Sequence, residues 1–183
     1  MRKEVIIMLF LAAGLASAGN FLVNGDFEQD LSVGWTSYMA DPVYGYDSIV
    51  RGTGYEPDPD YEVFTMSTFG YLTKLSQVVD IPSTANFTFA IKAKIVAFDN
   101  DADTLCWAAA AVKVSYLNSA GALLGETRIC RFSAPCPWAN ASTVHLIAAV
   151  DTLWHNYSFV LNTELANLPG VTPSQVKKIE VAL

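Results

Sequence analysis

The sequence predicts an all-β domain, an antiparallel sandwich of two sheets, behind a signal-peptide helix. Polar and apolar residues alternate with a period of two in several segments, as in strands with one buried face. Clusters of Gly, Pro, Asn and Asp separate these segments, and the one helical candidate, 163–168, would form only one or two turns. Many short strands without a long helix favour a sandwich over a closed barrel, its main rival.

The N-terminus has the pattern of a secretion signal. Arg2 and Lys3 precede an apolar run from Val5 to Leu15, which is too short to cross a bilayer comfortably, and Ala16-Ser17-Ala18 matches the small-x-small cleavage rule. We expect a signal peptide at 1–18 and a mature chain that starts at Gly19. The alternative is an uncleaved N-terminal anchor. Since no second apolar span follows, we expect a secreted or cell-surface protein with no membrane span after cleavage.

The strands are expected in the following order. Short strands are predicted at 48–51, 63–68 and 71–81. Stricter alternation predicts strands at 87–95 and 108–117, and the turn Asn118-Ser119-Ala120-Gly121 leads to a hairpin partner at 122–132. The last two expected strands lie at 157–161 and 179–183.

The length and the net charge of the chain limit the classes of molecule that it is expected to bind. The 165 residues from Gly19 onward are enough for one domain with its own core. Loss of the signal removes two basic residues and one acid, so the net charge of −7 becomes −8. An acidic chain without a basic stripe repels phosphate backbones, which argues against nucleic acid. The same charge is compatible with neutral sugars, with calcium, or simply with solubility.

Three cysteines follow the signal: Cys106, Cys130 and Cys136. Export favours one disulfide, and the odd number leaves one thiol over. The pairing stays open, because Cys130–Cys136 would close a small loop while Cys106 with either of the others would link neighbouring strands. Their spacing does not match a zinc site.

A series of motifs suggests a family. Asn24-Gly25-Asp26-Phe27-Glu28, closed by Gly34-Trp35, resembles the opening strand of jelly-roll β-sandwich modules, the carbohydrate-binding-module and galactose-binding-domain-like superfamily. Further segments resemble later strands of that superfamily in the same order, namely 71–82, 86–89, 112–127, 154–157 and 176–181. The resemblance spans residues 20–183 and implies one jelly-roll domain, without specifying a ligand.

The resemblance also implies a structural calcium ion with Glu28 as one ligand, although one carboxylate alone does not make a calcium site. The superfamily's last strand, which helps to complete that site, has no counterpart here. We therefore expect a domain at 19–183 that lacks its final strand, which would leave an unpaired edge and an uncovered apolar face. The acidic run from Asp99 to Asp103 lacks the glycine and glutamate of an EF-hand loop, so we expect a solvated loop.

A sugar-binding surface requires exposed aromatic rings with polar groups beside them. The alternation from Ala109 to Lys113 places Trp107 on the solvent side of its strand, and Trp138 follows two prolines in a loop. Trp35 and Trp154 are expected in the core. The candidate platform has these members: Trp107, Trp138, Tyr44, Tyr46, Tyr55 and Arg51.

The sequence contains little evidence of a catalytic site. Neither His145 nor His155 neighbours a serine or cysteine in a nucleophile pattern, and no spacing identifies the opposed carboxylates of a glycosidase. We expect a secreted, non-catalytic carbohydrate-binding module, with a polysaccharide or glycan as partner. The alternative is a structural or adhesive β-sandwich of a cell-surface protein that binds no sugar.

Overall fold

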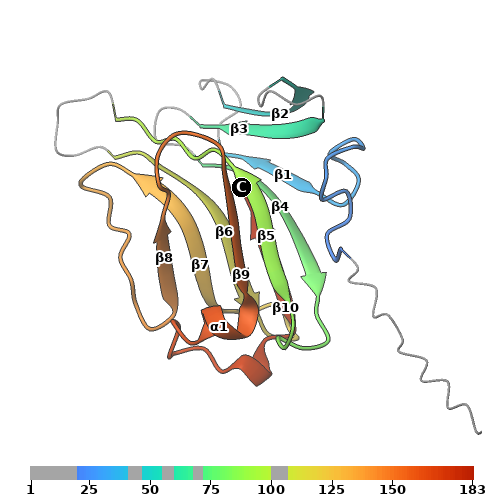
Figure 1. Ribbon diagram of the computed structural model, residues 1–183, viewed down its shortest axis with the longest axis vertical. Coiled ribbons are helices and arrows are strands. Elements are labelled where there is room, and N and C mark those ends of the chain that lie inside the picture. Colours follow the sequence, from blue (N-terminus) through green and yellow to red (C-terminus); the bar gives the residue numbers. More distant parts are fainter. Residues whose placement is uncertain (1–19, 41–46, 55–59, 68–71, 100–106) are drawn as a thin grey trace, which may run out of the picture.

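The computed structural model describes residues 20–40, 47–54, 60–67, 72–99 and 107–183. The expected signal peptide, Tyr44, Tyr46, Tyr55 and Cys106 lie outside these ranges. The regular secondary structure of the described chain is nearly all β, and it forms a β-sandwich-like fold that is compatible with a jelly roll (Figure 1). The predicted fold class is thereby confirmed.

One layer is a six-stranded sheet with the order β1-β4-β10-β6-β7-β8. Its strands are β1 (Thr36–Met39), β4 (Thr73–Asp80), β6 (Ala109–Leu117), β7 (Leu123–Phe132), β8 (Val144–Ala148) and β10 (Lys178–Ala182). All neighbours in this sheet are antiparallel except β7 and β8, which run parallel. The predicted hairpin is confirmed, since Asn118 Oδ1 accepts the amides of Ala120 and Ala122 at the turn and Gly121 adopts φ 85°.

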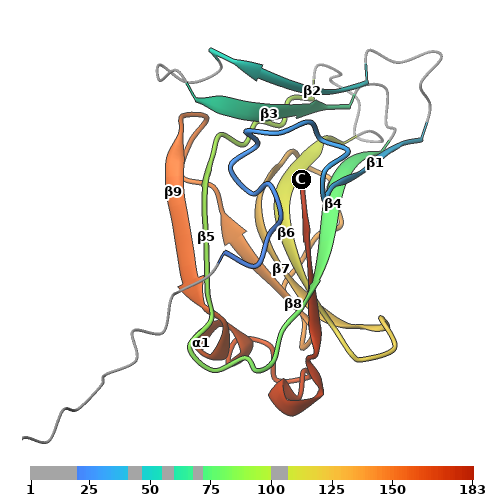
Figure 2. The same cartoon turned by 90° about the vertical axis from the view of Figure 1, so that its right-hand side faces the viewer.

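The rest of the sandwich consists of two smaller sheets. β5 (Thr88–Ala93) pairs with β9 (His155–Val160) and faces the six-stranded sheet, while β2 (Ser48–Thr53) pairs with β3 (Tyr61–Met66) across one end (Figure 2). α1 (Leu161–Leu165) and the 3-10 turn η1 (Pro173–Gln175) lie at the opposite end. α1 overlaps the helical turn that the sequence predicts at 163–168.

The core lies between the layers and follows the predicted alternation. On β6, Val112, Val114 and Tyr116 face inward and are fully or almost fully buried. They pack with inward residues of β4, β7 and β10 and with α1, namely Leu75, Ile129, Ile179, Val181, Leu161 and Leu165. Trp35 belongs to this core as predicted, whereas Trp154 is only partly buried.

The opening segment differs from the prediction. Residues 20–28 form turns and not a strand, because Asn24 and Phe27 adopt left-handed backbone angles, φ 51° and 58°. The Asn24 side chain replaces strand pairing: it donates to the carbonyls of Gln29 and Asp30 and accepts the Gln29 amide at 2.8 Å. The indole of Trp35 then donates to the Asn24 carbonyl at 3.0 Å, which ties the turn to the core.

β10 takes a central place in its sheet. It pairs with β4 on one side and β6 on the other, and the pairing with β4 extends to Leu183, whose backbone exchanges two hydrogen bonds with Leu75. The expectation that the domain lacks its final strand stays a prediction. In the described part of the chain, β9 is the only strand that pairs with β5, so the other side of β5 is a sheet edge.

Candidate functional site

The face of the six-stranded sheet that points away from the core carries a continuous line of charged side chains. Strand alternation places them on this face, and the register aligns them across four adjacent strands. We call these five residues the outer-face row: Lys74 on β4, Glu180 on β10, Lys113 on β6, and Glu126 and Arg128 on β7.

Each member of the outer-face row contacts the next. Lys74 Nζ lies 2.9 Å from Glu180 Oε1, and Lys113 Nζ lies between the two carboxylates, 4.0 Å from Glu180 Oε2 and 3.6 Å from Glu126 Oε2. Arg128 Nε donates to Glu126 Oε1 at 2.8 Å. Positive and negative groups therefore alternate across the face, which suppresses repulsion and fixes long side chains in place.

Glu180 shows the electrostatic effect of this arrangement. Partial burial by itself raises the pKa of the Glu180 carboxyl. The hydrogen bond and charge of Lys74, the charge of Lys113 and a hydrogen bond from Ser76 outweigh burial, so the pKa is lower than usual. Glu180 is consequently an anion across the physiological range.

An aromatic cluster adjoins the outer-face row at Arg128. The Arg128 guanidinium lies 4.4 Å from the centroid of the Trp138 ring, a cation–π contact. Trp138 meets Trp107 edge-on at 6.3 Å and Phe132 at 6.0 Å between ring centroids. Trp107 is 42% exposed and Phe132 40%, so both rings offer apolar surface to solvent.

The predicted platform is thus partly assembled. Trp107 is exposed, as its strand parity predicts, and Trp138 reaches it from the loop before β8. Arg51 is not part of this cluster. It lies on β2, in a different sheet, and its guanidinium is engaged with the N-terminal turn.

The position of Arg51 bears on the calcium site that is expected at Glu28. Its Nη2 donates to the Glu28 carbonyl at 2.7 Å and its Nε donates to the Phe27 carbonyl, while the guanidinium stacks 3.4 Å above the Tyr61 ring centroid. Calcium needs six to eight oxygen ligands at roughly 2.3–2.6 Å. An ion on the oxygens around Glu28 would displace the guanidinium, so the residues present do not fit a calcium site. Within the described ranges, no three His, Cys, Asp or Glu side chains gather as metal ligands.

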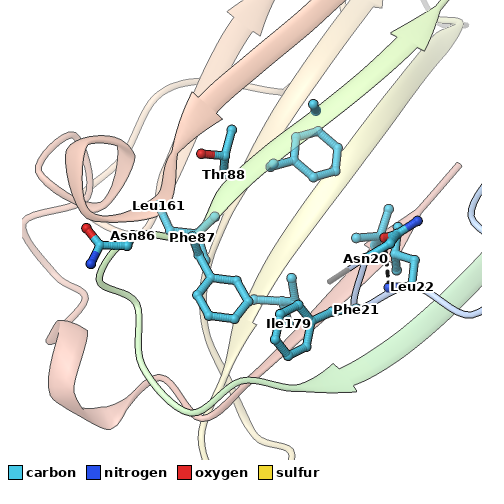
Figure 3. A pocket seen from close by; sticks show the side chains of 11 residues that line it. Asn20, Phe21, Leu22, Asn86, Phe87, Thr88, Leu161 and Ile179 are labelled. Atoms are coloured by element: carbon cyan, nitrogen blue, oxygen red, sulfur yellow. Dashed lines mark hydrogen bonds between the residues drawn. The ribbon is translucent and has the colours of Figure 1, made fainter. Parts of the chain in front are cut away.

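A pocket of about 360 Å³ lies away from the aromatic cluster, beside the open edge of β5 (Figure 3). The rings of Phe21 and Phe87 pack against each other in it, 4.6 Å between centroids. Ile179 and Val181 of β10 line its floor, so the pocket opens toward the core between the two layers.

A second polar group lies on the inner face of the six-stranded sheet. Glu164 of α1 is almost fully buried, accepts a hydrogen bond from Thr127 Oγ1 at 2.7 Å and lies 2.5 Å from His145 Nδ1. Because the Thr127 proton points to Glu164, Tyr116 donates to Thr127 over 3.0 Å. Asn167 Nδ2 donates to the second carboxylate oxygen at 3.2 Å.

The thiols of Cys130 and Cys136 are free in the structure. Burial raises the pKa of the Cys130 thiol, and the opposing charge of Arg128 does not offset burial. Cys130 is therefore a poor nucleophile.

Sequence reasoning missed most of the site. Arg128 and Phe132 lie on a strand that the sequence predicts, and their spacing from Glu126 already places all three on one face. This regular two-residue spacing is the sequence pattern that could have identified these residues as neighbours on one face. Trp138 contacts Arg128 only through the path of a loop, which no spacing reveals.

Comparison with known proteins gives no further assignment. No helix in the described part of the chain has the length and apolarity that crossing a membrane requires. No protein-family model matches the sequence, and no curated protein is similar to it.

Proposed function

We propose that the protein is a secreted, non-catalytic carbohydrate-binding module whose platform is the aromatic cluster and the adjoining outer-face row. The observation that carries the proposal is the exposed Trp107 beside Trp138 at the end of a line of charged groups. A sugar ring offers an apolar face to an aromatic ring and hydroxyls to polar neighbours, and both kinds of partner adjoin here.

Fixed geometry supports this proposal. Glu126 holds Arg128 by a hydrogen bond, and Arg128 in turn covers one side of Trp138. Side chains that are ordered before binding lose less entropy when a ligand arrives. The resemblance of the chain to the carbohydrate-binding-module superfamily points to the same class of ligand, and the signal pattern at 1–18 to secretion.

Affinity electrophoresis in gels that contain a panel of soluble polysaccharides tests the proposal on the mature chain from Gly19. We expect retardation by at least one polysaccharide, and about tenfold weaker binding for Trp107→Ala, since a lost ring contact is worth roughly 1–1.5 kcal/mol. Phe64→Ala removes a similarly exposed aromatic ring from β3, which belongs to a different sheet, and is the matched control, which should bind as the unmodified chain does. Absence of retardation by the whole panel, with an intact β-sheet circular-dichroism spectrum, would reject the proposal.

A structural or adhesive module is the second candidate, and the pocket beside the open edge of β5 favours it. Free strand edges pair readily with strands of other chains. This candidate predicts association that increases with protein concentration and is abolished by Ala90→Pro on β5, together with no polysaccharide retention. Sedimentation velocity and the gels described above separate the two functions.

A further inference from the structure

The N-terminal turn is held in a backbone conformation that is unfavourable by itself. Phe27 has φ 58°, a left-handed angle that is unfavourable for a non-glycine residue. The Phe27 ring packs against Trp35, 5.2 Å between centroids, so the conformation serves to bury this side chain. Such a turn persists only where neighbouring groups fix it.

Arg51 supplies that fixation from a different sheet. Its guanidinium donates to two successive carbonyl oxygens of the turn, those of Phe27 and Glu28, and stacks on Tyr61 of β3. The Glu28 carboxylate adds a weak contact in the other direction, because it accepts the Tyr61 amide at 3.4 Å. The turn and the β2–β3 sheet are thus joined at one point by a cation.

The charge around Arg51 is negative on the turn side. Hydrogen bonds from the backbone and hydroxyl of Ser32 lower the pKa of the Asp30 carboxyl, and the charge of Arg51 lowers it further. Two carbonyls and nearby carboxylates are the oxygen donors that a hard divalent cation would take. A planar guanidinium satisfies the two carbonyls at once, which a lysine ammonium cannot do with the same geometry.

We propose that the guanidinium of Arg51 is the built-in cation of this turn, and that it fixes the turn to the β2–β3 sheet without a divalent ion. The domain then needs no calcium, in contrast to the expectation from the family resemblance. The proposal concerns the end of the sandwich at β2–β3 and does not depend on glycan binding at the aromatic cluster.

Thermal unfolding of the mature chain, followed by circular dichroism, tests this proposal. The midpoint should change by less than about 1 °C between excess EDTA and 10 mM CaCl₂ as the probe. Arg51→Ala should lower the midpoint by at least about 3 °C in EDTA, because loss of two charge-assisted hydrogen bonds is substantial for a domain of this size. Lys94→Ala, which removes an exposed cation just beyond β5, is the control and should leave the midpoint unchanged.

Arg51→Lys distinguishes the fork geometry from charge alone and provides a folded variant if Arg51→Ala does not fold. We expect a midpoint between those of the unmodified chain and Arg51→Ala. A calcium-induced increase of several degrees in the unmodified chain would overturn the proposal. An Arg51→Ala or Arg51→Lys midpoint equal to that of the unmodified chain in EDTA would overturn it as well.

Discussion

Glu126 and Glu164 are both more than nine-tenths buried, yet they lie on opposite faces of the six-stranded sheet and are satisfied in opposite ways. Glu126 is balanced by cations, Lys113 and Arg128, on the face that carries the candidate site. Glu164 receives hydrogen bonds from Thr127 and Asn167 and contacts the imidazole of His145, which links α1 to β7 and β8. The comparison separates a polar group that shapes a surface from one that specifies the fold.

The difference follows from what surrounds each carboxylate. Thr127 and, behind it, Tyr116 are fully buried, so the Glu164 carboxylate cannot exchange this donor for water without opening the core. The cations of Glu126 keep 20–30% of their side chains exposed, so solvent can replace part of each interaction. Substitutions should consequently affect stability most on the inner face and ligand binding most on the outer face.

The largest expected effect is that of Glu164→Ala. Loss of the carboxylate leaves Thr127 and, through it, Tyr116 without their buried partner, which should cost about 3 kcal/mol of unfolding free energy. Urea unfolding measures this loss. Glu164→Gln retains an acceptor and should lose less. A loss below about 1 kcal/mol for Glu164→Ala would contradict a fold-specifying role.

Glu126→Gln should cost less, about 1–2 kcal/mol, because its partly exposed partners can be hydrated. It should also weaken glycan binding, since Arg128 loses the group that orients it under Trp138. Urea unfolding and affinity electrophoresis provide the two measurements. Asp80→Asn, which changes an exposed acid 3.6 Å from Lys178, is the control and should affect neither. Equal stability losses for Glu126→Gln and Glu164→Ala would remove the contrast between the faces.

The decrease of the unfolding free energy at alkaline pH should report on the buried hydrogen bond of Tyr116 on the inner face. Burial raises the pKa of the Tyr116 hydroxyl far above its usual value, the Thr127 hydrogen bond opposes this, and the charge of Glu164 raises it further. The folded state therefore holds this proton more tightly than the unfolded state. Its contribution is fully present below about pH 10, the pKa in the unfolded chain, and is lost as pH rises above that value.

Tyr116→Phe tests this linkage. It should cost about 1 kcal/mol at neutral pH, since one buried hydrogen bond is lost, and should flatten the decline in stability above pH 10. Unfolding free energies at pH 7, 9, 10.5 and 11.5 compare the two chains. An unchanged alkaline slope in the variant would assign the decline to other groups.

The smallest effect on stability is expected at acidic pH, for the ion pair between Lys74 and Glu180 on the outer face. The pKa of Glu180 is lowered in the folded chain, so its contribution is present above the unfolded pKa of about 4.5 and is lost as pH falls. Lys74→Ala should reduce stability at pH 7 by less than about 1 kcal/mol, because the ion pair is partly exposed to solvent and Lys113 remains beside Glu180. At pH 2.5 the variant and the unmodified chain should be equally stable, and a persistent difference there would exclude the ion pair as its cause.

The sequence predicts those parts of the fold in which one strand face is buried. Alternation identified β5 and β6, whose inward-facing apolar residues form part of the core, and the turn at 118–121 identified β7 as the hairpin partner of β6. β1 is exposed throughout, so it has no buried face to produce a pattern. The sequence predicts a strand at residues 20–28 because residue types alone do not reveal the left-handed backbone angles that Asn24 and Phe27 adopt.

The candidate site was predictable only in part, for a related reason. Strand parity gave the exposure of Trp107, since parity is a local property. Lys113 and Glu126 lie on one hairpin, but Glu180 reaches them because β10, which is far away in the sequence, pairs with β6, and this long-range pairing depends on the whole sheet. Arg51 illustrates the converse: its residue type suited a sugar platform, but the fold places its guanidinium on the turn at Glu28.

Tryptophan fluorescence during titration with the polysaccharide that gives the strongest gel retardation tests the central claim most directly. Stacking of a sugar on Trp107 excludes water, so we predict a saturable blue shift of the emission that is lost in Trp107→Ala and retained in Phe64→Ala. The same saturable shift in Trp107→Ala, or no shift with any polysaccharide while the β-sheet spectrum is intact, would contradict the assignment of the aromatic cluster as a glycan platform.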